Sequence, residues 1–389
     1  MSETTLTTPV RVVTGPFLAV VAAGLCFFFG MGVVMPVLPR FIEGDLGGSS
    51  FIVGVVVGSF AFSAVLARPM AGRLGNRYGR RNLMIAGSVI AGLSLTLYAA
   101  AHSPFELAAF RLITGVGDGL FFTGSATLVA DMAPPSRRGQ ALSYFSITAY
   151  LGQGLGPTLG EAVASGPGRR WTFVVGGALG LLGALLSAWA PNLRPPSSVT
   201  AERQPLLNRK ALGPGAVLGL GLMGFTVFSV YVPLYVKTLG MSGSKFVFLV
   251  YASVVMLVRL VGARLPDALG VQRTGTLATG SIAVGLAITA AWHSSLGLYV
   301  SAMVIGVGMA LQYPALMAMA VNRASEAERS SVVGSFTAFF DLAFGLGGFV
   351  LGGVVSVGGY RAGFAAGSVC AVLALLLLRL RVARTVTST

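Results

Sequence analysis

The sequence predicts an all-α membrane protein with twelve transmembrane helices in two pseudo-symmetric six-helix bundles and with both termini in the cytoplasm. Three observations lead to this fold class. Of the 389 residues, 54% are apolar and the mean hydropathy is +0.82, well above the values of water-soluble domains. The apolar residues form stretches long enough to cross a bilayer, and the second half of the chain repeats residues of the first half at a constant offset.

Twelve apolar stretches have about the 17 to 25 residues that a helix needs to cross ~30 Å of hydrocarbon. The stretches expected to form the first bundle are 16–38, 51–67, 83–101, 107–130, 140–162 and 171–190. Those expected to form the second bundle are 213–236, 246–262, 274–292, 296–321, 331–357 and 362–380. We therefore expect an N-terminal lobe at 1–190, a polar cytoplasmic linker at 191–212 and a C-terminal lobe at 213–389.

Basic residues set the expected orientation of these helices. The net charge is +15, and most of the 27 basic residues fall in alternate connectors, above all the five arginines within 68–81. Because positively charged loops stay in the cytoplasm, these connectors and both termini are expected on the inner side of a bacterial plasma membrane. No basic stretch is interleaved with aromatic residues, so the lipid bilayer is an expected partner and nucleic acid is not.

The internal repeat pairs a position in the first half with the position whose number is higher by 191. Its matched pairs include Arg68 with Arg259, Arg73 with Arg264, Gly79 with Gly270, Gly154 with Gly345, and the GVG tripeptides at 115–117 and 306–308. In the same register Asn76 falls on Asp267. Parallel repeats of this kind are typical of transporters that bind their substrate between two lobes, near the middle of the membrane.

Four short motifs resemble those of the twelve-span drug:proton antiporters of the major facilitator superfamily. They are GMGVVMPVLP at 30–39, GRLGNRYGRR at 72–81, FRLITG at 110–115 and GQGLGPTLGE at 152–161. The resemblance covers essentially the whole chain. It implies a secondary active transporter rather than an enzyme, which exports small hydrophobic or amphipathic organic compounds in exchange for protons by alternating access. It also implies a monomer that needs no cofactor and no metal.

The motif at 72–81 is expected to form a gate at the cytoplasmic side. In the resembled family, an aspartate at the place of Asn76 contacts the N-terminus of the eleventh span and closes that side. Asn76 keeps a hydrogen-bond acceptor but lacks the charge, so a weaker gate is expected here. The residues assigned to this gate are Gly72, Arg73, Asn76, Arg77, Gly79, Arg80 and Arg81, with Arg264 and Asp267 in the second half.

The fifth span contains a row of small residues. Gly152, Gly156 and Gly160 recur every four residues and form one helix face, while Pro157 removes a backbone hydrogen bond and allows a bend. One interpretation is a hinge for the movement of the lobes. The other is ordinary close packing against a neighbouring helix.

Ionisable residues inside the expected spans are costly and therefore need a reason. At 1.5 Å per residue, Asp118 lies about 18 Å from the outer end of its span and Asp341 about 15 Å from the inner end of its own, both near the midplane. One of them is expected to carry the proton. The alternative for each is a structural role, as a buried side chain that forms hydrogen bonds between helices. Arg111 lies roughly 10 Å farther out than Asp118, too far for a direct salt bridge. Glu161 is expected to be a solvated carboxylate or a partner of Arg111.

Aromatic and methionine side chains are expected to line the substrate cavity, because apolar and polarisable walls suit varied amphipathic compounds. Few amide side chains accompany them, which argues against a sugar or metabolite transporter of the same fold, the main alternative. GVGD at 115–118 also fits an intramembrane protease motif, but no Tyr-Asp pair precedes it, so a membrane enzyme is a remote alternative. The cavity candidates are Phe28, Met31, Met35, Phe121, Phe122, Phe225, Phe228, Tyr231, Met309, Gln312 and Tyr313.

Overall fold

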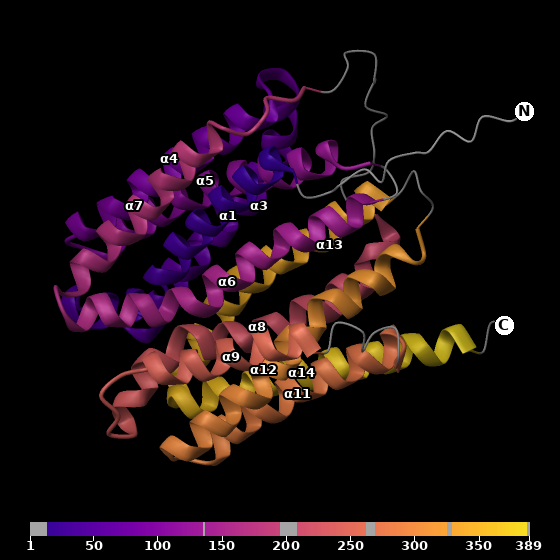
Figure 1. Ribbon diagram of the computed structural model, residues 1–389. Coiled ribbons are helices and arrows are strands. Elements are labelled where there is room, and N and C mark those ends of the chain that lie inside the picture. The colour runs from indigo at the N-terminus through magenta and orange to yellow at the C-terminus, as the bar shows by residue number, and fades with distance from the viewer. Residues whose placement is uncertain (1–13, 135–136, 195–207, 262–268, 325–328, 387–389) are drawn as a thin grey trace, which may run out of the picture.

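The computed structural model describes residues 14–134, 137–194, 208–261, 269–324 and 329–386, and these are almost entirely helical (Figure 1). The first half contains α1 (Gly15–Val34), α2 (Leu38–Arg40), the π-helix η1 (Phe41–Asp45), α3 (Ser50–Tyr78), α4 (Arg80–Leu97), the 3-10 turn η2 (Tyr98–Ala100), α5 (Pro104–Met132), α6 (Arg138–Ser165) and α7 (Arg169–Ser187). The second half contains α8 (Arg209–Thr238), α9 (Lys245–Val261), α11 (Val271–Ala291), α12 (Ser295–Val321), α13 (Arg329–Leu346), the π-helix η5 (Gly347–Leu351) and α14 (Gly352–Val386).

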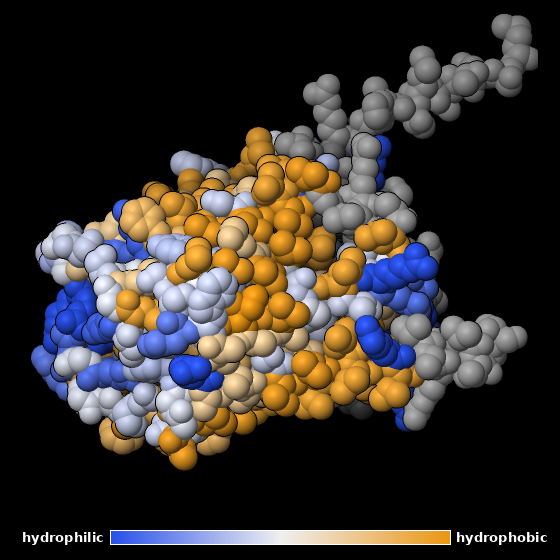
Figure 2. All heavy atoms as spheres, turned by 90° about the horizontal axis from the view of Figure 1, so that it is seen from below, coloured by the Kyte–Doolittle hydropathy of each residue, from blue (hydrophilic) through white to orange (hydrophobic). Residues whose placement is uncertain are grey.

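The surface of the protein is that of a membrane protein. Nine segments of the described chain are long and apolar enough to cross a bilayer. Figure 2 shows a broad apolar band, with hydrophilic side chains gathered toward the two ends of the molecule. Water-soluble proteins rarely expose a contiguous apolar surface of this extent. The chain is therefore a multi-pass membrane protein, while the count of twelve spans and the cytoplasmic termini remain predictions.

Helix α3 is longer than its apolar stretch. We expected the second span to end at residue 67 and the arginines of 68–81 to lie in a connector. In the structure α3 continues to Tyr78, so Arg68, Arg73 and Arg77 are helical, and α4 begins at Arg80. The expected connector was wrong because arginine is a good helix former and a helix does not need to stop where the hydrocarbon ends.

The internal repeat recurs in the backbone. Gly79 and Gly270 have φ of 94° and 80°, and each stands directly before a helix. A side chain beyond glycine is strained at such angles, so the same tight turn is built twice. Ser103 and Ser294, another matched pair of the repeat, each cap a helix by accepting a hydrogen bond from the third N–H group beyond them.

A second pair of glycines marks the last turn of each half. Gly168 has φ of 115° and precedes α7; Gly359 has φ of 75° and interrupts the helical backbone inside α14. Two helical stretches of α14 meet at this kink, so the break at Gly359 falls between the expected spans at 331–357 and 362–380.

The helices pack mainly within their own half of the chain (Figure 1). In the first half α1 contacts α6 and α7, and α5 contacts α3 and α4; in the second half α11 contacts α12 and α14, and α8 contacts α13 and α14. The halves meet where α3 packs against α13, η5 and α14, and where α6 packs against α9. Backbones come close at the first contact, since a Cβ added to Gly348 would lie 3.0 Å from the carbonyl oxygen of Gly54. The lobe boundaries at 190 and 213 remain predictions.

Candidate functional site

A buried ion pair joins the two halves. Arg68 of α3 contacts Asp341 of α13, with 2.7 Å between Nη2 and Oδ2, and Asp341 is 6% exposed. The guanidinium of Arg68 also lies over the ring of Phe122, 4.6 Å from its centroid. At 1.5 Å per residue, Asp341 lies about 18 Å and Arg68 about 27 Å from the start of their helices. Asp341 is therefore a paired carboxylate deep in the bundle that connects α13 to α3.

The role of Arg68 in this site was missed in the sequence. The arginines of 68–81 were interpreted as a topological signal and a gate, and Arg68 lies one position beyond the expected end of its span. Two signals pointed to a separate role. Arg68 precedes the motif at 72–81, and the repeat matches it with Arg259, another arginine next to an apolar run.

Asp118 lies in the middle of α5, about 21 Å from either end at 1.5 Å per residue, and is 7% exposed. One helix turn after Asp118, the ring of Phe122 is covered by the guanidinium of Arg68 at 4.6 Å. Among the residues that the structure describes, none forms an ion pair with Asp118. The site therefore combines a buried carboxylate that is paired with Arg68 and a second one that has no ion pair among the described residues.

Arg111 is 3% exposed and is held by the backbone of α3. Its Nε and Nη2 donate hydrogen bonds to the carbonyl oxygens of Val56 and Val57, at 3.4 and 3.2 Å. Its guanidinium also lies 4.7 Å from the centroid of the Phe60 ring. Arg111 therefore ties α5 to α3, and within the described residues it has no carboxylate partner.

Glu161 is neither a solvated carboxylate nor the partner of Arg111, and both expectations were wrong. It is 6% exposed, its Oε2 lies 2.6 Å from Nη2 of Arg40, and its Oε1 accepts a hydrogen bond from the hydroxyl of Ser244. The apolar sequence around Glu161 carried no sign of Arg40, which arrives from α2. Since Ser244 belongs to the second half, Glu161 connects the two halves.

Glu161 lies in the last turns of α6, and α6 ends at the side of the bundle away from the labelled termini, which we call the distal end (Figure 1). Further bonds between the halves lie here. The hydroxyl of Tyr231 donates to the carbonyl of Ser50 at 2.8 Å, and the hydroxyl of Tyr360 donates to Glu43 at 3.3 Å. Glu43 also accepts a hydrogen bond from Ser50 at 2.7 Å. The residues of this distal network are Arg40, Glu43, Ser50, Glu161, Tyr231, Ser244 and Tyr360.

The described residues assigned to the gate lie around the other end of α3, and three of the seven are exposed. Arg73, Asn76 and Arg77 are exposed, and no residue in the described ranges forms a side-chain hydrogen bond with Asn76. Arg80 is 8% exposed and pairs with Asp131 of α5 at 3.3 Å, within the same half. Gly72 has open space around it, Gly79 forms the turn to α4, and Arg81 is half-buried. Arg264 and Asp267 lie outside the described residues.

The glycine row of α6 faces α1. A Cβ added to Gly156 would lie 2.7 Å from Cα of Gly32, and Cβ atoms on Gly152 and Gly160 would meet the backbone of Phe28 and Val33. Pro157 lies inside α6 without ending it. The close-packing interpretation therefore describes this contact, which lies within one half; the hinge role of Gly152, Gly156, Pro157 and Gly160 stays a prediction.

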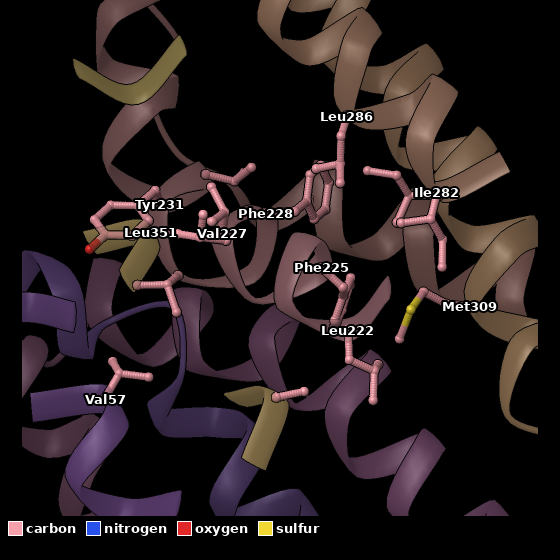
Figure 3. Close-up of a cluster of buried hydrophobic side chains, with 14 of the residues drawn as sticks. Val57, Leu222, Phe225, Val227, Phe228, Tyr231, Ile282, Leu286, Met309 and Leu351 are labelled. Atoms are coloured by element: carbon pink, nitrogen blue, oxygen red, sulfur yellow. The ribbon is translucent and has the colours of Figure 1, made fainter. Parts of the chain in front are cut away.

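The cavity candidates fall into two aromatic clusters, one in each half. Phe28, Phe121 and Phe122 form edge-to-face pairs in the first half, with Met31 against the same core. In the second half Phe225 and Phe228 of α8 stack beside Tyr251, and Figure 3 shows them near Met309 of α12. Tyr231 instead joins the distal network, and Met35 is half-buried.

Two polar candidates lie on α12. Gln312 is 1% exposed, and neither its amide nitrogen nor its amide oxygen has a hydrogen-bond partner. The neighbouring Tyr313 packs its ring against Phe336 and Phe340 of α13 and against Tyr150 of α6, at centroid distances of 5.5, 6.3 and 6.4 Å. A buried amide without a partner costs free energy, so this position is suited to a ligand that supplies one. In the described ranges, no group of three or more metal-ligating side chains occurs.

Comparison with known proteins adds the family. The sequence model of the Major Facilitator Superfamily matches residues 20–290 and 246–389. The uncharacterized MFS-type transporter YhhS of Escherichia coli (strain K12) is 26% identical over 381 residues, which are 92% of this chain and 90% of YhhS. The quinolone resistance protein NorA of Staphylococcus aureus (strain MRSA252) is 31% identical over 216 residues, 52% of this chain and 55% of NorA. The crystal structure of the nucleoside transporter NupG has a TM-score of 0.71 at 16% identity and covers 94% of this chain and 99% of its own.

Proposed function

The chain belongs to the Major Facilitator Superfamily, and from that premise we propose that it exports small hydrophobic or amphipathic organic compounds in exchange for protons. Its relatives and structural neighbours are transporters and not enzymes, so the intramembrane protease is set aside. A small-molecule substrate and a membrane location follow from the family. Export, proton coupling and the kind of substrate are the proposed part. Their support is the fifth-span motif, the aromatic clusters and the partial similarity to NorA.

The observation that carries proton coupling is Asp118, a buried carboxylate without an ion pair among the described residues, one helix turn before the Phe122 ring that Arg68 covers. An ionised carboxylate without a partner is costly to bury, whereas a protonated carboxylic acid is neutral. Proton binding to Asp118 therefore favours conformations in which the centre is closed to water. Proton loss favours a hydrated, open centre. Asp341 is the second candidate, but its guanidinium partner already compensates its charge in this conformation.

Alternating access needs contacts that hold one end of the bundle closed at a time. The distal network supplies such contacts, since Ser244, Tyr231 and Tyr360 of the second half bond to residues of the first half. With the proposed orientation of the termini, the distal end is the outer end. The conformation described here is then the one that is closed to the outside, and the exposed Asn76 belongs to the end that is free to open.

The test is transport in proteoliposomes under an imposed pH gradient, with a quinolone, a lipophilic cation, a nucleoside and a sugar as substrates. We expect gradient-driven movement of the quinolone or the cation. Asp118→Asn should reduce it at least tenfold while counterflow exchange, which moves no net proton, survives. Asp45→Asn removes a carboxylate that pairs with Arg169 near the surface and serves as the control.

One observation favours the second candidate function, a nucleoside or other metabolite transporter. The buried Gln312 amide without a partner is suited to a polar substrate, and NupG is named a nucleoside transporter. Movement of the nucleoside or the sugar, with no movement of the quinolone or the cation, would establish this function in place of drug export.

A further inference from the structure

Arg259 of α9 is a second guanidinium at the contact between the halves. Its Cζ lies 3.4 Å from the centroid of the Tyr150 ring of α6. Its Nε and Nη2 atoms are buried and have no hydrogen-bond partner. Among the residues that the structure describes, no carboxylate forms an ion pair with it. Within the described residues, Arg259 is therefore a half-buried positive charge without an anion to compensate it.

The internal repeat shows that Arg259 lacks the carboxylate partner that its counterpart has. Arg259 is the counterpart of Arg68, and Tyr150 is the counterpart of Asp341, both in the register of the internal repeat. The same arrangement across the two halves is thus built twice. In one copy the arginine meets a carboxylate at 2.7 Å, and in the other it meets the face of a tyrosine ring. The cation–π contact compensates a buried charge much less than a hydrogen-bonded carboxylate does.

We propose that Arg259 binds the anionic group of the transported substrate, an organic carboxylate or sulfonate with an aromatic or aliphatic body. The substrate's oxygens take the place that the carboxylate of Asp341 has beside Arg68. This inference rests on the proposed transport function and specifies the substrate class of that transporter.

The surroundings of Arg259 fit such a molecule. The Tyr313 ring lies 6.4 Å from the Tyr150 ring that Arg259 covers, so it borders the same contact between the halves. The rings of Phe336 and Phe340 lie next to Tyr313 and offer an apolar surface for the body of the substrate. Asp341, the nearby carboxylate, is already engaged by Arg68 and does not compensate Arg259.

The test compares 2-naphthoate, 2-naphthalenesulfonate and the neutral 2-naphthamide, which share one apolar body. Purified protein is reconstituted in nanodiscs of phosphatidylcholine, and saturable shifts of the unfolding temperature give the dissociation constants. We expect the two anions to bind and the amide to bind at least tenfold more weakly. Arg259→Gln should weaken anion binding at least tenfold. Arg273→Gln, which removes an exposed arginine from the same half, should leave it unchanged.

A second variant tests the charge itself without a ligand. Tyr150→Asp rebuilds at Arg259 the pair that Arg68 forms with Asp341. It should raise the unfolding temperature of the ligand-free protein and abolish anion binding, and Arg259→Gln in the same chain should cancel the rise. If neither anion binds better than the amide, or if anion binding survives Arg259→Gln, the inference is wrong.

Two further arms distinguish a substrate from a lipid and anion binding from transport. If adding phosphatidylglycerol to the nanodiscs stabilises the protein through Arg259 while the naphthalene anions do not, the occupant is a lipid headgroup and not a substrate. Anion binding that depends on Arg259, without gradient-driven transport in proteoliposomes, would overturn the proposed proton-coupled export but confirm the anion site at Arg259. Gradient-driven transport of neutral and cationic compounds, with no anion binding, would support the proposed function and overturn the anion site at Arg259.

Discussion

Arg68 and Asp341 each depend on the other, because either charge alone would be buried without a partner. Breaking a buried pair by removing one member typically costs ~3 to 5 kcal/mol, whereas replacing both members is often much less costly. We expect Arg68→Gln and Asp341→Asn each to lower the unfolding temperature in detergent clearly. The double variant should lose less than the sum of the two. Arg77→Gln, exposed on the same helix, is the control; strictly additive losses would show that the pair is not coupled.

Asn76 offers a residue-scale test of the gate. Asn76→Asp restores a charge that is favourable near a helix N-terminus by ~0.3 to 1 kcal/mol, and by up to ~2 kcal/mol when partly buried. Asn76 is exposed in the described conformation. The added charge should therefore stabilise the other conformation, in which the end opposite the distal end is closed. We expect a shift of several-fold toward that conformation, read as a shorter spin-label distance between the C-terminal ends of α5 and α12. The control Asn82→Asp adds the same charge to α4; equal distances in both variants would reduce the motif to a topological role.

The depth of the site residues was predictable, but their partners were not. Helix rise is fixed, so counting along the chain places Asp118 and Asp341 deep in their helices, where the structure has them. The pairing of Glu161 with Arg40, and of Asp341 with Arg68, depends on which faces of different helices meet. A sequence without its tertiary contacts does not contain that information.

At the scale of helices, the contact between α6 and α1 depends on glycine. A Cβ at Gly156 would lie 2.7 Å from Cα of Gly32, backbone that cannot move without separating the two helices. Overpacking of this kind typically costs ~1 to 3 kcal/mol. We therefore expect Gly156→Ala to lower the unfolding temperature. Gly280→Ala in α11, where nothing lies within 4 Å of the added methyl group, should leave it unchanged or raise it. If both variants lowered the unfolding temperature by a similar amount, the effect would come from replacing glycine in a helix and not from the contact between α6 and α1.

The existence of the helices followed from apolar stretches, while some of their ends did not. The expected span at 83–101 ends within one residue of the end of η2 at Ala100. The chain turns there because Ser103 caps the start of the next helix, α5. The stretch at 51–67 ends well before Tyr78, the last residue of α3, because hydropathy records the hydrocarbon boundary and not the end of the hydrogen-bonded helix. The glycines at 79 and 359 were the better boundary signals, since their backbone angles are positive.

For the whole molecule, the internal repeat explains both what is alike and what differs between the halves. Gly79 and Gly270 build the same turn twice, whereas the counterpart of Asp341 is Tyr150. Within the described part of the chain, the protein itself therefore neutralises one of the two symmetric arginine sites and not the other. In the proposed transport cycle, the similar halves would allow the bundle to close at either end. The unequal charges at their contact would then let the proton and the substrate favour different conformations.

The distal network leads to the last prediction, because in the proposed alternating-access cycle its bonds between the halves break when the distal end opens. Ser244→Ala and Tyr360→Phe each remove one hydrogen bond between the halves, and a hydrogen bond contributes ~0.5 to 1.5 kcal/mol, or ~1.5 to 3 kcal/mol when its partner is charged, as Glu161 and Glu43 are. Since ~1.4 kcal/mol is a factor of ten in a population, the double variant should populate the distally open conformation at least tenfold more. Spin labels at the exposed positions Phe105 and Leu296, which the repeat matches, would report it as a longer distance, after Cys26→Ser and Cys370→Ser remove the native thiols. Ser368→Ala removes a hydroxyl that bonds to Ala283 within the second half and should leave the distance unchanged; an unchanged distance in the double variant as well would mean that the network does not hold the distal end closed.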